Sequence, residues 1–333
     1  MSIRIVKQGL LDTMQDAGRY GYQHWGINPG GAADNVSHTV ANVLAGNNTT
    51  EAVIELHYPA CAIQFEEDAL VALSGANFSP VINGEPVPLN TPIIVNSSSI
   101  LEFTKPGGHL ACYLSINGGF KLDPWLGSYS TNTRAGAGGY KGRKLKAGDV
   151  LFFKKNQDFS PILKGNAFLP LGWKAAVPVM FPKRQSIRVS AGNEYDLLCG
   201  ASKDILVHSA FTVTPDTDRM GCRLSGIPLQ IDMHGSLVSA GVTAGTIQLL
   251  PSGQLIILAA DHQATGGYPR IAHIISADRH LFGHLQPGEV IHFELTDIKE
   301  AERLFAQQHH YLQQLQNACT LRLENFFAEH ALY

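Results

Sequence analysis

Two stretches of this chain, AGDVLFF at residues 147–153 and PGEVIHF at residues 287–293, share one pattern. In each, a glycine and an acidic residue predict a turn, and the β-branched and aromatic residues that follow predict a strand. Each stretch comes late in its half of the chain. The repeat indicates two related β-domains, although such turns are common enough for one match to arise by chance.

Short runs of β-forming residues occur on both sides of these two stretches. They lie between Gly, Pro, Asn and Ser positions, and the chain holds 33 glycines and 17 prolines that can supply turns. Strands and turns at this spacing favour barrels or sandwiches over alternating βαβ units. The predicted fold class is therefore mainly β. The runs that we interpret as strands include residues 93–95, 100–103, 110–116, 205–207 and 255–260.

Two segments show helical spacing of apolar residues instead. The first covers residues 35–45, with Asp34 as the expected N-cap and Gly46 at the end. The second runs from about residue 297 to 327, and we expect it to pack on a β-domain or on a partner protein. Its apolar positions are Ala301, Leu304, Phe305, Leu312, Leu315 and Leu321.

The length of 333 residues exceeds one typical core and is enough for two domains. We predict an N-terminal β-domain at residues 1–154, a connector at 155–186, a second β-domain at 187–296 and a C-terminal helix at 297–333. The connector is predicted from its prolines, which are Pro161, Pro170, Pro178 and Pro182.

Composition excludes several classes of function. The net charge of −3 gives no basic field that would attract nucleic acid or an anionic membrane. The start of the chain lacks the apolar core of a signal peptide, and no window reaches the roughly 18 apolar residues of a membrane span. The five scattered cysteines form no CxxC and the histidines no HExxH, so neither a disulfide framework nor a metal site is indicated. We expect a cytoplasmic protein.

A candidate site follows the predicted strand 255–260. The loop DHQATGGYPR, residues 261–270, holds two adjacent glycines, Gly266 and Gly267, which allow a tight turn or a close approach to a ligand. A strand that delivers a polar loop is a common way to build a binding site. A purely structural turn is the alternative. The polar groups around the glycines belong to Asp261, Gln263, Thr265 and Tyr268.

Other polar residues also stand beside glycines. Arg19 is suited to a carboxylate or phosphate, but the alternative is that it pairs with Asp16. Asp34 has the alternative of capping its helix. Arg219 lies in the segment 216–224, where ion pairing with the two nearby acids is the alternative. The loop at residues 127–143 fits neither nucleotide-binding glycine pattern, and Ser239 lacks the glycines of a nucleophile elbow.

Taken together, five blocks resemble the family of biotin-dependent carboxyltransferase-like proteins called allophanate hydrolase subunit 2. The resemblance runs from about residue 6 to 300, and we expect the C subunit of bacterial 5-oxoprolinase to be the nearest member. It implies two tandem cyclophilin-like β-barrels with a site between them. The blocks are QDAGR (15–19), ANVLAGN (41–47), LGSYST (126–131), DRMGCRL (218–224) and TGGYP (265–269).

The chain departs from the family pattern at three positions. His262 stands where an arginine is usual, Ala264 where a threonine is usual, and Gly30 where a serine is common. Losing an arginine and a hydroxyl weakens the case for carboxylate or bicarbonate handling by this loop, since a histidine carries charge only near or below neutral pH.

The motifs and the resemblance together select the candidate site residues, with no metal ligands among them. The expected catalytic residues are Arg19, Asp34, Arg219, Asp261 and Gln263. The expected substrate-binding residues are Ser128, Ser130, Ser239, Gln248, Thr265, Gly266, Gly267 and Tyr268.

The resemblance implies one component of a multi-subunit, ATP-dependent 5-oxoprolinase that hydrolyses 5-oxoproline to glutamate. The chain shows no P-loop, so we expect it to bind no cofactor, to be inactive alone, and to leave ATP to two partners, a subunit-1-like protein and a LamB/YcsF-like protein. One alternative is the carboxyltransferase component of a biotin-dependent urea or amide carboxylase, with biotin on a separate carrier. Another is a non-enzymatic regulatory protein that binds a subunit-1-like partner. A homodimer is an alternative assembly.

Overall fold

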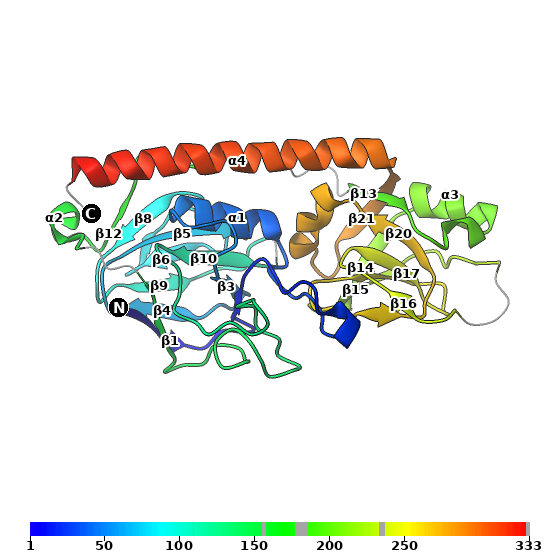
Figure 1. The fold of residues 1–333 in the computed structure, drawn as a ribbon, viewed down its shortest axis with the longest axis horizontal. Helices are drawn as coiled ribbons and strands as arrows, with labels where there is room; N and C mark the ends of the chain where they lie inside the picture. The colour runs from blue at the N-terminus through cyan, green and yellow to red at the C-terminus, as the bar shows by residue number, and fades with distance from the viewer. Residues whose placement is uncertain (109, 155–157, 177–185, 233–236, 331–333) are drawn as a thin grey trace. The chain divides into compact units, whose positions relative to one another are not determined.

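A computed structural model describes residues 1–108, 110–154, 158–176, 186–232 and 237–330 of the chain. The chain divides into two compact units (Figure 1). Unit 1 comprises Met1–Gly18, Asp34–Val177 and His310–Tyr333, and unit 2 comprises Arg19–Ala33 and Pro178–His309. Much of the predicted connector, residues 155–157 and 177–185, lies outside the described residues.

Unit 1 contains two six-stranded sheets, ordered β11-β1-β4-β9-β6-β7 and β12-β8-β5-β10-β3-β2. Apolar side chains from both sheets form one core, in which Ile5, Phe65 and Leu114 have no exposed surface. The strands are β1 (Ser2–Lys7), β2 (Thr13–Gln15), β3 (Val53–Leu56), β4 (Ala62–Phe65), β5 (Ala69–Gly75), β6 (Pro80–Ile82), β7 (Glu85–Pro86), β8 (Pro92–Val95), β9 (Ile100–Phe103), β10 (Cys112–Ile116), β11 (Val150–Phe152) and β12 (Phe168–Pro170).

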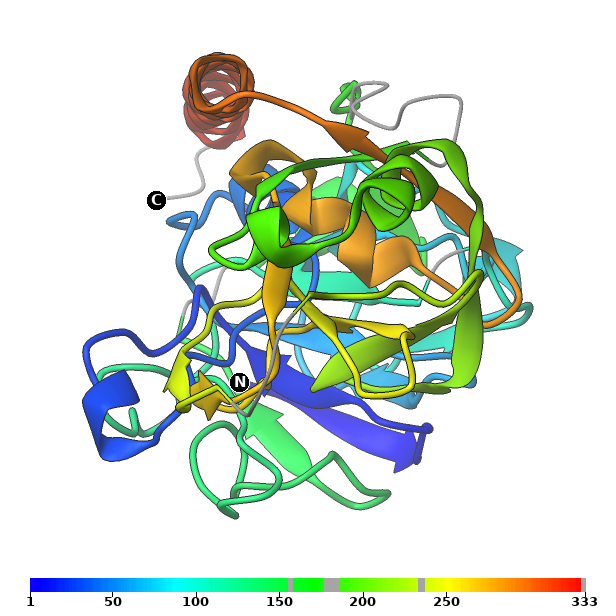
Figure 2. The same cartoon turned by 90° about the vertical axis from the view of Figure 1, so that its right-hand side faces the viewer.

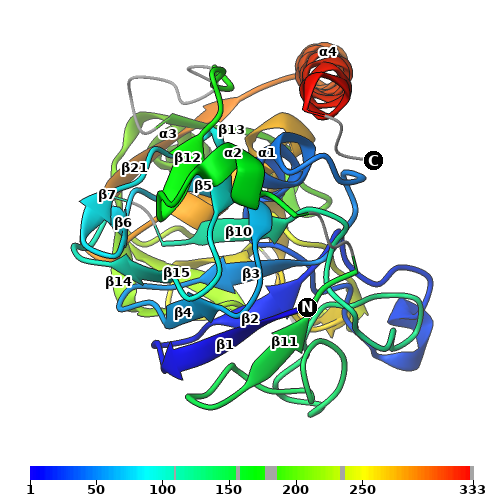
Figure 3. The ribbon, with the colours of Figure 1, turned by 90° about the vertical axis from the view of Figure 1, so that its left-hand side faces the viewer.

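Helix α1 (Asn35–Leu44) covers β5 and β10 of unit 1 (Figure 3). The predicted cap is confirmed, because the Asp34 carboxylate accepts the backbone N–H groups of Val36 and Ser37, both at 2.9 Å. Gly46 follows the helix with φ of 73°, a left-handed conformation that glycine adopts without strain. The helix therefore begins and ends where the sequence indicates.

Unit 2 is a closed barrel with strand order β13-β20-β17-β18-β15-β14-β21 (Figure 2). A separate two-stranded ribbon, β16 with β19, lies beside it. The strands are β13 (Ser186–Ala191), β14 (Phe211–Thr217), β15 (Gly221–Ser225), β16 (Ala240–Gly241), β17 (Thr246–Leu249), β18 (Leu255–Leu258), β19 (Thr265–Gly266), β20 (Arg270–Ile274) and β21 (Val290–Leu295). The short helices are η1 (Gln23–Trp25), η2 (Tyr195–Leu197), η3 (Ser276–His284) and α3 (Gly200–His208).

The repeated stretch forms the same structure in both units. Gly148 and Gly288 have φ of 90° and 91°, and each precedes a strand, β11 or β21. The acid after each glycine, Asp149 or Glu289, accepts the backbone N–H three residues earlier at 2.8 or 2.9 Å. Each strand then pairs antiparallel with a neighbour, β11 with β1 and β21 with β14. The match in sequence reflects a match in geometry, and the prediction of a mainly β fold is confirmed.

One predicted strand is wrong. Residues 205–207 lie in helix α3, not in a strand. A run of three apolar residues is too short to show a period, and only Leu206 is fully buried, in the same helix as buried Ser202 four residues earlier. The four-residue spacing of buried Ser202 and Leu206 is the spacing of a helix.

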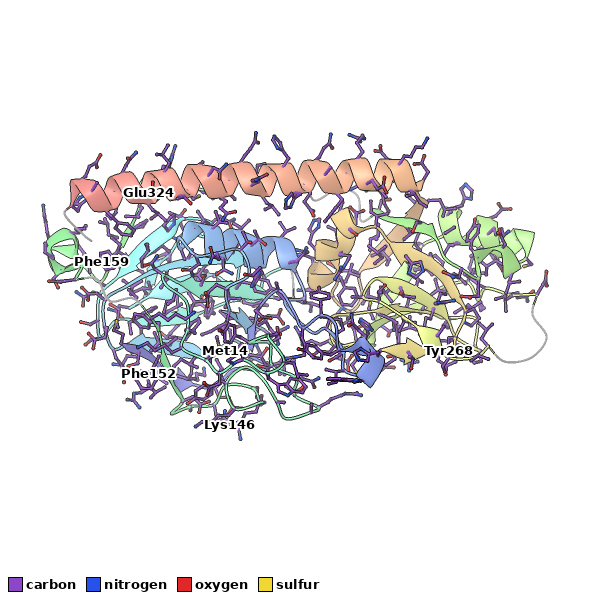
Figure 4. The ribbon with its side chains drawn as sticks, in the orientation of Figure 1. Met14, Lys146, Phe152, Phe159, Tyr268 and Glu324 are labelled. Atoms are coloured by element: carbon purple, nitrogen blue, oxygen red, sulfur yellow. The ribbon has the colours of Figure 1, made fainter. Side chains whose placement is uncertain are left out.

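The C-terminal helix α4 (Ile298–Glu329) is confirmed, but its buried stripe differs from the expected one. Leu304, Leu312 and Leu315 are only half-buried, and Leu321 is 58% exposed. The buried positions are Gln308, Cys319 and Leu323. Leu323 packs in unit 1 with a cluster that includes Phe159, which precedes α2 (Ser160–Leu163). Figure 4 labels Phe159. Leu321 precedes Leu323 by two residues, about 200° around a helix, and so faces away.

Among the residues described, no helix combines the length and the apolar composition needed to cross a membrane.

Candidate functional site

An arginine–carboxylate pair stands at one end of the unit 2 barrel. Arg219, between β14 and β15, donates from Nε and Nη2 to the Asp261 carboxylate at 2.8 and 3.1 Å. The two residues meet because β15 pairs with β18, with Gly221 opposite Leu258, and each flanks its strand at the same end. Asp261 also donates its backbone N–H to the Arg219 carbonyl at 2.6 Å. Arg219 thus pairs with Asp261, although two acids stand closer to it in sequence.

The same arginine fixes a third segment of unit 2. Nη2 of Arg219 also donates to the Gly31 carbonyl oxygen at 2.7 Å. At the other end of residues 19–33, the Arg19 N–H donates to the Pro29 carbonyl at 2.6 Å, and the Arg19 side chain is buried. Arg219 and Asp261 are only 11% and 15% exposed as side chains, so the bidentate pair is well shielded from water. The arrangement is suited to holding three backbone segments in place.

The β16–β19 ribbon covers Gln248 of the barrel strand β17. Gln248 is 1% exposed, and its Nε2 donates to the Tyr268 carbonyl at 3.5 Å. A Cβ atom at Gly266 would lie 2.5 Å from that Nε2, so any larger residue there would force the end of the Gln248 side chain to shift. Gln248 Oε1 is buried and accepts no hydrogen bond. Gln248 therefore joins the barrel strand β17 to the end of the ribbon.

Neither the backbone conformation nor a close contact requires a glycine at position 267. Its φ lies outside the left-handed region, and an added Cβ would be 3.4 Å from Ser239 Oγ, an ordinary contact. Gly267 therefore adopts backbone angles that other residues also adopt. The closer contact falls on Gly266.

The outer side of the ribbon presents polar groups to solvent. Ser239, Gln263 and Thr265 are exposed, and Tyr268 is 45% exposed (Figure 4). Beside them is a cavity of about 610 Å³, a volume typical of small-molecule pockets. Its described lining is mostly apolar, with Asp232 as the one charged side chain. The lining comprises Leu229, Gln230, Ile231, Asp232, Leu237, Leu249, Leu250, Pro251, Gly253, Gly267, Tyr268 and Pro269.

His262 does not replace the arginine that the family usually has there. It is 2% exposed, and its ring Nδ1 lies 2.6 Å from the Gln263 carbonyl oxygen, which requires a proton on Nδ1. Burial lowers the pKa of His262 below the usual 6.5. The imidazole is therefore neutral at pH 7. Ala264, the second departure, is also buried.

Three expected site residues belong to unit 1, where their polar groups have partners. The hydroxyls of Ser128 and Ser130 donate to Asp16 Oδ1 at 2.8 and 2.5 Å, and the Tyr129 N–H donates to Asp16 Oδ2 at 2.6 Å. Both serines have no exposed surface. Asp34 caps α1. These contacts stabilise unit 1, and the carboxylate of Asp16 organises the loop that carries both serines.

Sequence reasoning missed a buried polar network beside Asp34. The Asp34 N–H donates to the Tyr113 hydroxyl at 2.8 Å, and that hydroxyl donates to Glu55 Oε2 at 2.9 Å. Glu55 has no exposed surface, and burial raises the pKa of Tyr113 well above 10. The available signal was a carboxylate inside the apolar run VIEL at residues 53–56.

The expected site residues thus form two groups. Asp34, Ser128 and Ser130 lie in unit 1, and the rest lie in unit 2, where the ribbon, the Arg219–Asp261 pair and residue 19 are found. No group of three or more His, Cys, Asp or Glu side chains within the described part of the chain is arranged to hold a metal ion.

Comparison with known proteins finds proteins that are similar by sequence and solved structures that are similar in fold, among them the following protein and two structures. The chain is 33% identical to the C subunit of 5-oxoprolinase from Escherichia coli (strain K12) over 313 residues, which cover 94% of this chain and 97% of that protein. The crystal structure of the K. lactis urea amidolyase matches with a TM-score of 0.85 and 26% identity, over 94% of this chain and 20% of that one. The crystal structure of TTHA0988 matches with a TM-score of 0.75 and 27% identity, over 88% of this chain and 55% of that one.

A family model also matches most of the chain. It covers residues 25–295, which include the whole unit 2 barrel and the strands β3 to β12 of unit 1. The match agrees with the resemblance that the five sequence blocks indicate. The chain belongs to the family described as carboxyltransferase domain, subdomain A and B.

Proposed function

We propose that this chain is the C subunit of a cytoplasmic, ATP-dependent 5-oxoprolinase, which hydrolyses 5-oxoproline to glutamate. The observation that carries the proposal is the similarity to the C subunit of the Escherichia coli 5-oxoprolinase, which covers 94% of this chain and 97% of the relative. Similarity over both full lengths means that the relative holds no additional domain of its own to account for its activity.

The chemistry requires partners. A lactam carbonyl is stabilised by resonance and is a poor electrophile, so phosphoryl transfer from ATP is a sensible route to its activation. This chain has no P-loop motif. In the proposal, the subunit-1-like protein and the LamB/YcsF-like protein bind ATP and share the reaction, and this chain completes a composite site.

The contribution of this chain comes from the outer side of the ribbon. Thr265 and Tyr268 present hydroxyl donors there. The backbone of Thr265 pairs with Gly241 of β16, and the Tyr268 carbonyl accepts from Gln248 of β17 at 3.5 Å. Preorganised donors stabilise the negative charge that develops on a carbonyl oxygen during attack. Arg219 acts with Asp261 as a positioning pair, because its guanidinium is already engaged by that carboxylate and by Gly31.

A carboxyltransferase is the second candidate. The specific observation in its favour is the TM-score of 0.85 to the K. lactis urea amidolyase. In this case carboxybiotin on a separate carrier would donate a carboxyl group to urea or a similar amide. A rise in carboxylated product on addition of a biotinylated carrier, without hydrolysis of 5-oxoproline, would select this candidate. Sequestration of the subunit-1-like protein without any turnover would select the regulatory alternative.

The test is reconstitution. The purified chain with 5-oxoproline and ATP should release no glutamate, and addition of both partner proteins should produce glutamate and ADP. Tyr268→Phe and Gln263→Ala remove exposed polar groups without disturbing the core, so each should lower turnover of the complex at least about tenfold, or about 1.4 kcal/mol. Hydrolysis by the chain alone would contradict the composite enzyme. Full activity of both variants would make the loop a structural turn.

A further inference from the structure

A buried amide lies between the barrel and the ribbon of unit 2, and its oxygen has no hydrogen-bond partner. Gln248 of β17 is 1% exposed, and its Oε1 accepts no hydrogen bond from the residues that the structure describes. Its Nε2 reaches the Tyr268 carbonyl oxygen only at 3.5 Å, which is long for a hydrogen bond. A buried acceptor without a donor lowers the stability of the fold, so this amide is a candidate for binding a ligand.

Gln248 points away from the barrel core and towards the ribbon. Its neighbours in β17, Ile247 and Leu249, belong to the apolar core of unit 2, so the alternation of a strand directs Gln248 to the opposite face. On that face Gly266 of β19 covers the amide, because a Cβ atom added there would lie 2.5 Å from Nε2. The ribbon backbone therefore occupies the space next to the amide.

A guanidinium lies on the same face. Arg270 of β20 stands opposite Gln248 in the pairing of β17 with β20, and the side chains of opposite residues lie on one face of a sheet. Nε and Nη2 of Arg270 donate to the Glu194 carboxylate at 3.0 and 2.8 Å, which holds the guanidinium in place. Nη1 donates to the Gly241 carbonyl oxygen of the ribbon at 3.3 Å. The ribbon thus contacts both the amide and the guanidinium.

Few contacts hold the ribbon over these two groups. The ribbon consists of two residue pairs, which carry only small or polar side chains, and Gly241 and Thr265 are exposed. The hydrogen bonds from Gln248 and Arg270, at 3.5 and 3.3 Å, are both long. Few apolar contacts and exposed backbone hydrogen bonds are the features of a segment that opens at low free energy.

The cavity of about 610 Å³ beside the ribbon gives a ligand its way in. Leu249, Gly267 and Tyr268 line the cavity, and Leu249 and Gly267 directly follow Gln248 and Gly266 in the chain. Most of the described lining is apolar, which suits the carbon atoms of a small ring. A ligand in the cavity therefore reaches the amide when the ribbon lifts.

The amide and the guanidinium together fit a cyclic amide that carries a carboxylate. The ring of a lactam holds its N–H and C=O on one edge, and the primary amide of Gln248 offers a donor and an acceptor on one edge in the same way. The two edges form two hydrogen bonds, and Oε1 gains its donor. In 5-oxoproline the carboxylate is attached to the carbon next to the ring nitrogen. A cation on the residue opposite Gln248 is suited to bind it.

We propose that the ribbon is a lid over a lactam subsite, in which the Gln248 amide pairs with the lactam edge of 5-oxoproline and Nη1 of Arg270 binds the carboxylate. This inference deepens the proposed function and rests on it for the identity of the substrate. Thr265 belongs to the lid, so the hydroxyl donor that the proposed function uses moves with it.

The experiment measures the affinity of the full-length chain for 5-oxoproline by NMR titration. Gln248→Met is close to wild type in side-chain size and removes both amide groups, and Gln307→Met is the matched control, since Gln307 is exposed and also belongs to unit 2. Gln248→Met should lower the affinity at least about tenfold, and the control should leave it unchanged. The melting temperature of Gln248→Met should equal or exceed that of wild type, because a buried acceptor without a donor is removed. A lower melting temperature with unchanged affinity would make the amide purely structural.

Other small ligands separate the two parts of the subsite. 2-Pyrrolidinone has the lactam edge without the carboxylate, so wild type should bind it at least about tenfold more weakly than 5-oxoproline. Gln248→Met should weaken both lactams by the same factor. Proline has the ring and the carboxylate but no carbonyl on the ring, so its affinity should not distinguish Gln248→Met from wild type. Tighter binding of urea than of 5-oxoproline would overturn the role of Arg270, because urea offers an amide edge and no carboxylate.

Hydrogen exchange tests the lid. The Val242 N–H donates to the Ala264 carbonyl oxygen at 3.1 Å next to the ribbon, and saturation with 5-oxoproline should slow its exchange, because the bound ligand holds the ribbon closed. Unchanged exchange at saturation would remove the lid. No binding of either lactam by wild type would remove the subsite.

Failure of the inference and failure of the proposed function give different results. If the chain binds 5-oxoproline through Gln248 but the reconstituted complex releases no glutamate, the subsite stands and the proposed function fails. If the complex releases glutamate and Gln248→Met changes neither the affinity nor KM, the proposed function stands and the subsite is overturned.

Discussion

Two adjacent glycines of the ribbon should respond differently to the same small substitution. A methyl group at Gly266 would lie 2.5 Å from Gln248 Nε2, closer than real Cβ contacts, so the amide of Gln248, which is 1% exposed, would have to shift. A methyl group at Gly267 would lie 3.4 Å from Ser239 Oγ, on the exposed side. Neither glycine has φ in the left-handed region. Gly266→Ala and Gly267→Ala therefore differ only in what the added carbon meets.

The expected magnitudes follow from two opposing terms. Overpacking costs about 1–3 kcal/mol, whereas the smaller conformational entropy of the unfolded chain with alanine contributes about 0.4–1 kcal/mol of stability. The midpoints leave a net loss of about 1.3 kcal/mol for Gly266→Ala. Gly267→Ala carries no overpacking term and should gain about 0.7 kcal/mol. The two variants should thus differ by about 2 kcal/mol in the free energy of opening the ribbon.

Hydrogen exchange measures this opening directly. The Val242 N–H donates to the Ala264 carbonyl at 3.1 Å, next to the ribbon pairs Ala240–Gly266 and Gly241–Thr265. Its exchange should be about tenfold faster in Gly266→Ala and slower than wild type in Gly267→Ala. Adding Gln248→Ala removes the atom that the methyl group strikes, so the double variant should recover most of the loss. Equal exchange in both alanine variants, or no recovery with Gln248→Ala, would refute the close approach.

Three further predictions test other parts of the structure. Leu323→Asp should lower the free energy of unfolding by more than about 3 kcal/mol in urea titrations, because it places a charge in the unit 1 cluster, whereas Leu321→Asp on the exposed face should change it by less than about 0.5 kcal/mol. Burial lowers the pKa of His38 below 6.5, so this histidine binds a proton more readily in the unfolded chain than in the folded one. The stability that the neutral His38 contributes is complete above about pH 6.5 and is lost on acidification towards the folded pKa. His38→Gln should flatten this loss of stability between neutral pH and about pH 5. Arg219→Lys loses the bidentate contact to Asp261 and cannot match the fork geometry, so backbone amides of residues 19–33 should exchange faster while β17 is unchanged.

The sequence by itself determined the elements whose signals are local. The turn and strand at residues 147–153 and 287–293, the cap at Asp34 and the glycine after α1 depend on backbone preferences and on hydrogen bonds within a few residues. These signals were sufficient for a mainly β fold with two related units. The ordered blocks identified the family, because several matches in order are improbable by chance.

Only the tertiary structure decided which side chain meets which. Arg219 lies closer in sequence to Asp218 than to Asp261, yet the pairing of β15 with β18 brings Asp261 to its guanidinium. Asp16 is joined to Ser128 and Ser130 across more than a hundred residues. Contacts of this kind depend on strand register, and no local preference encodes register.

The same reason explains the errors at residues 205–207 and in α4. An apolar run shows that some face is buried, but the neighbouring elements decide which face it is, and Leu321 and Leu323 differ only in that respect. Likewise, two adjacent glycines look equivalent in sequence, and only the position of Gln248 shows that an added Cβ meets a closer contact at Gly266 than at Gly267. Local propensity determined the elements of this protein, and packing between distant segments determined which residues of the candidate site meet.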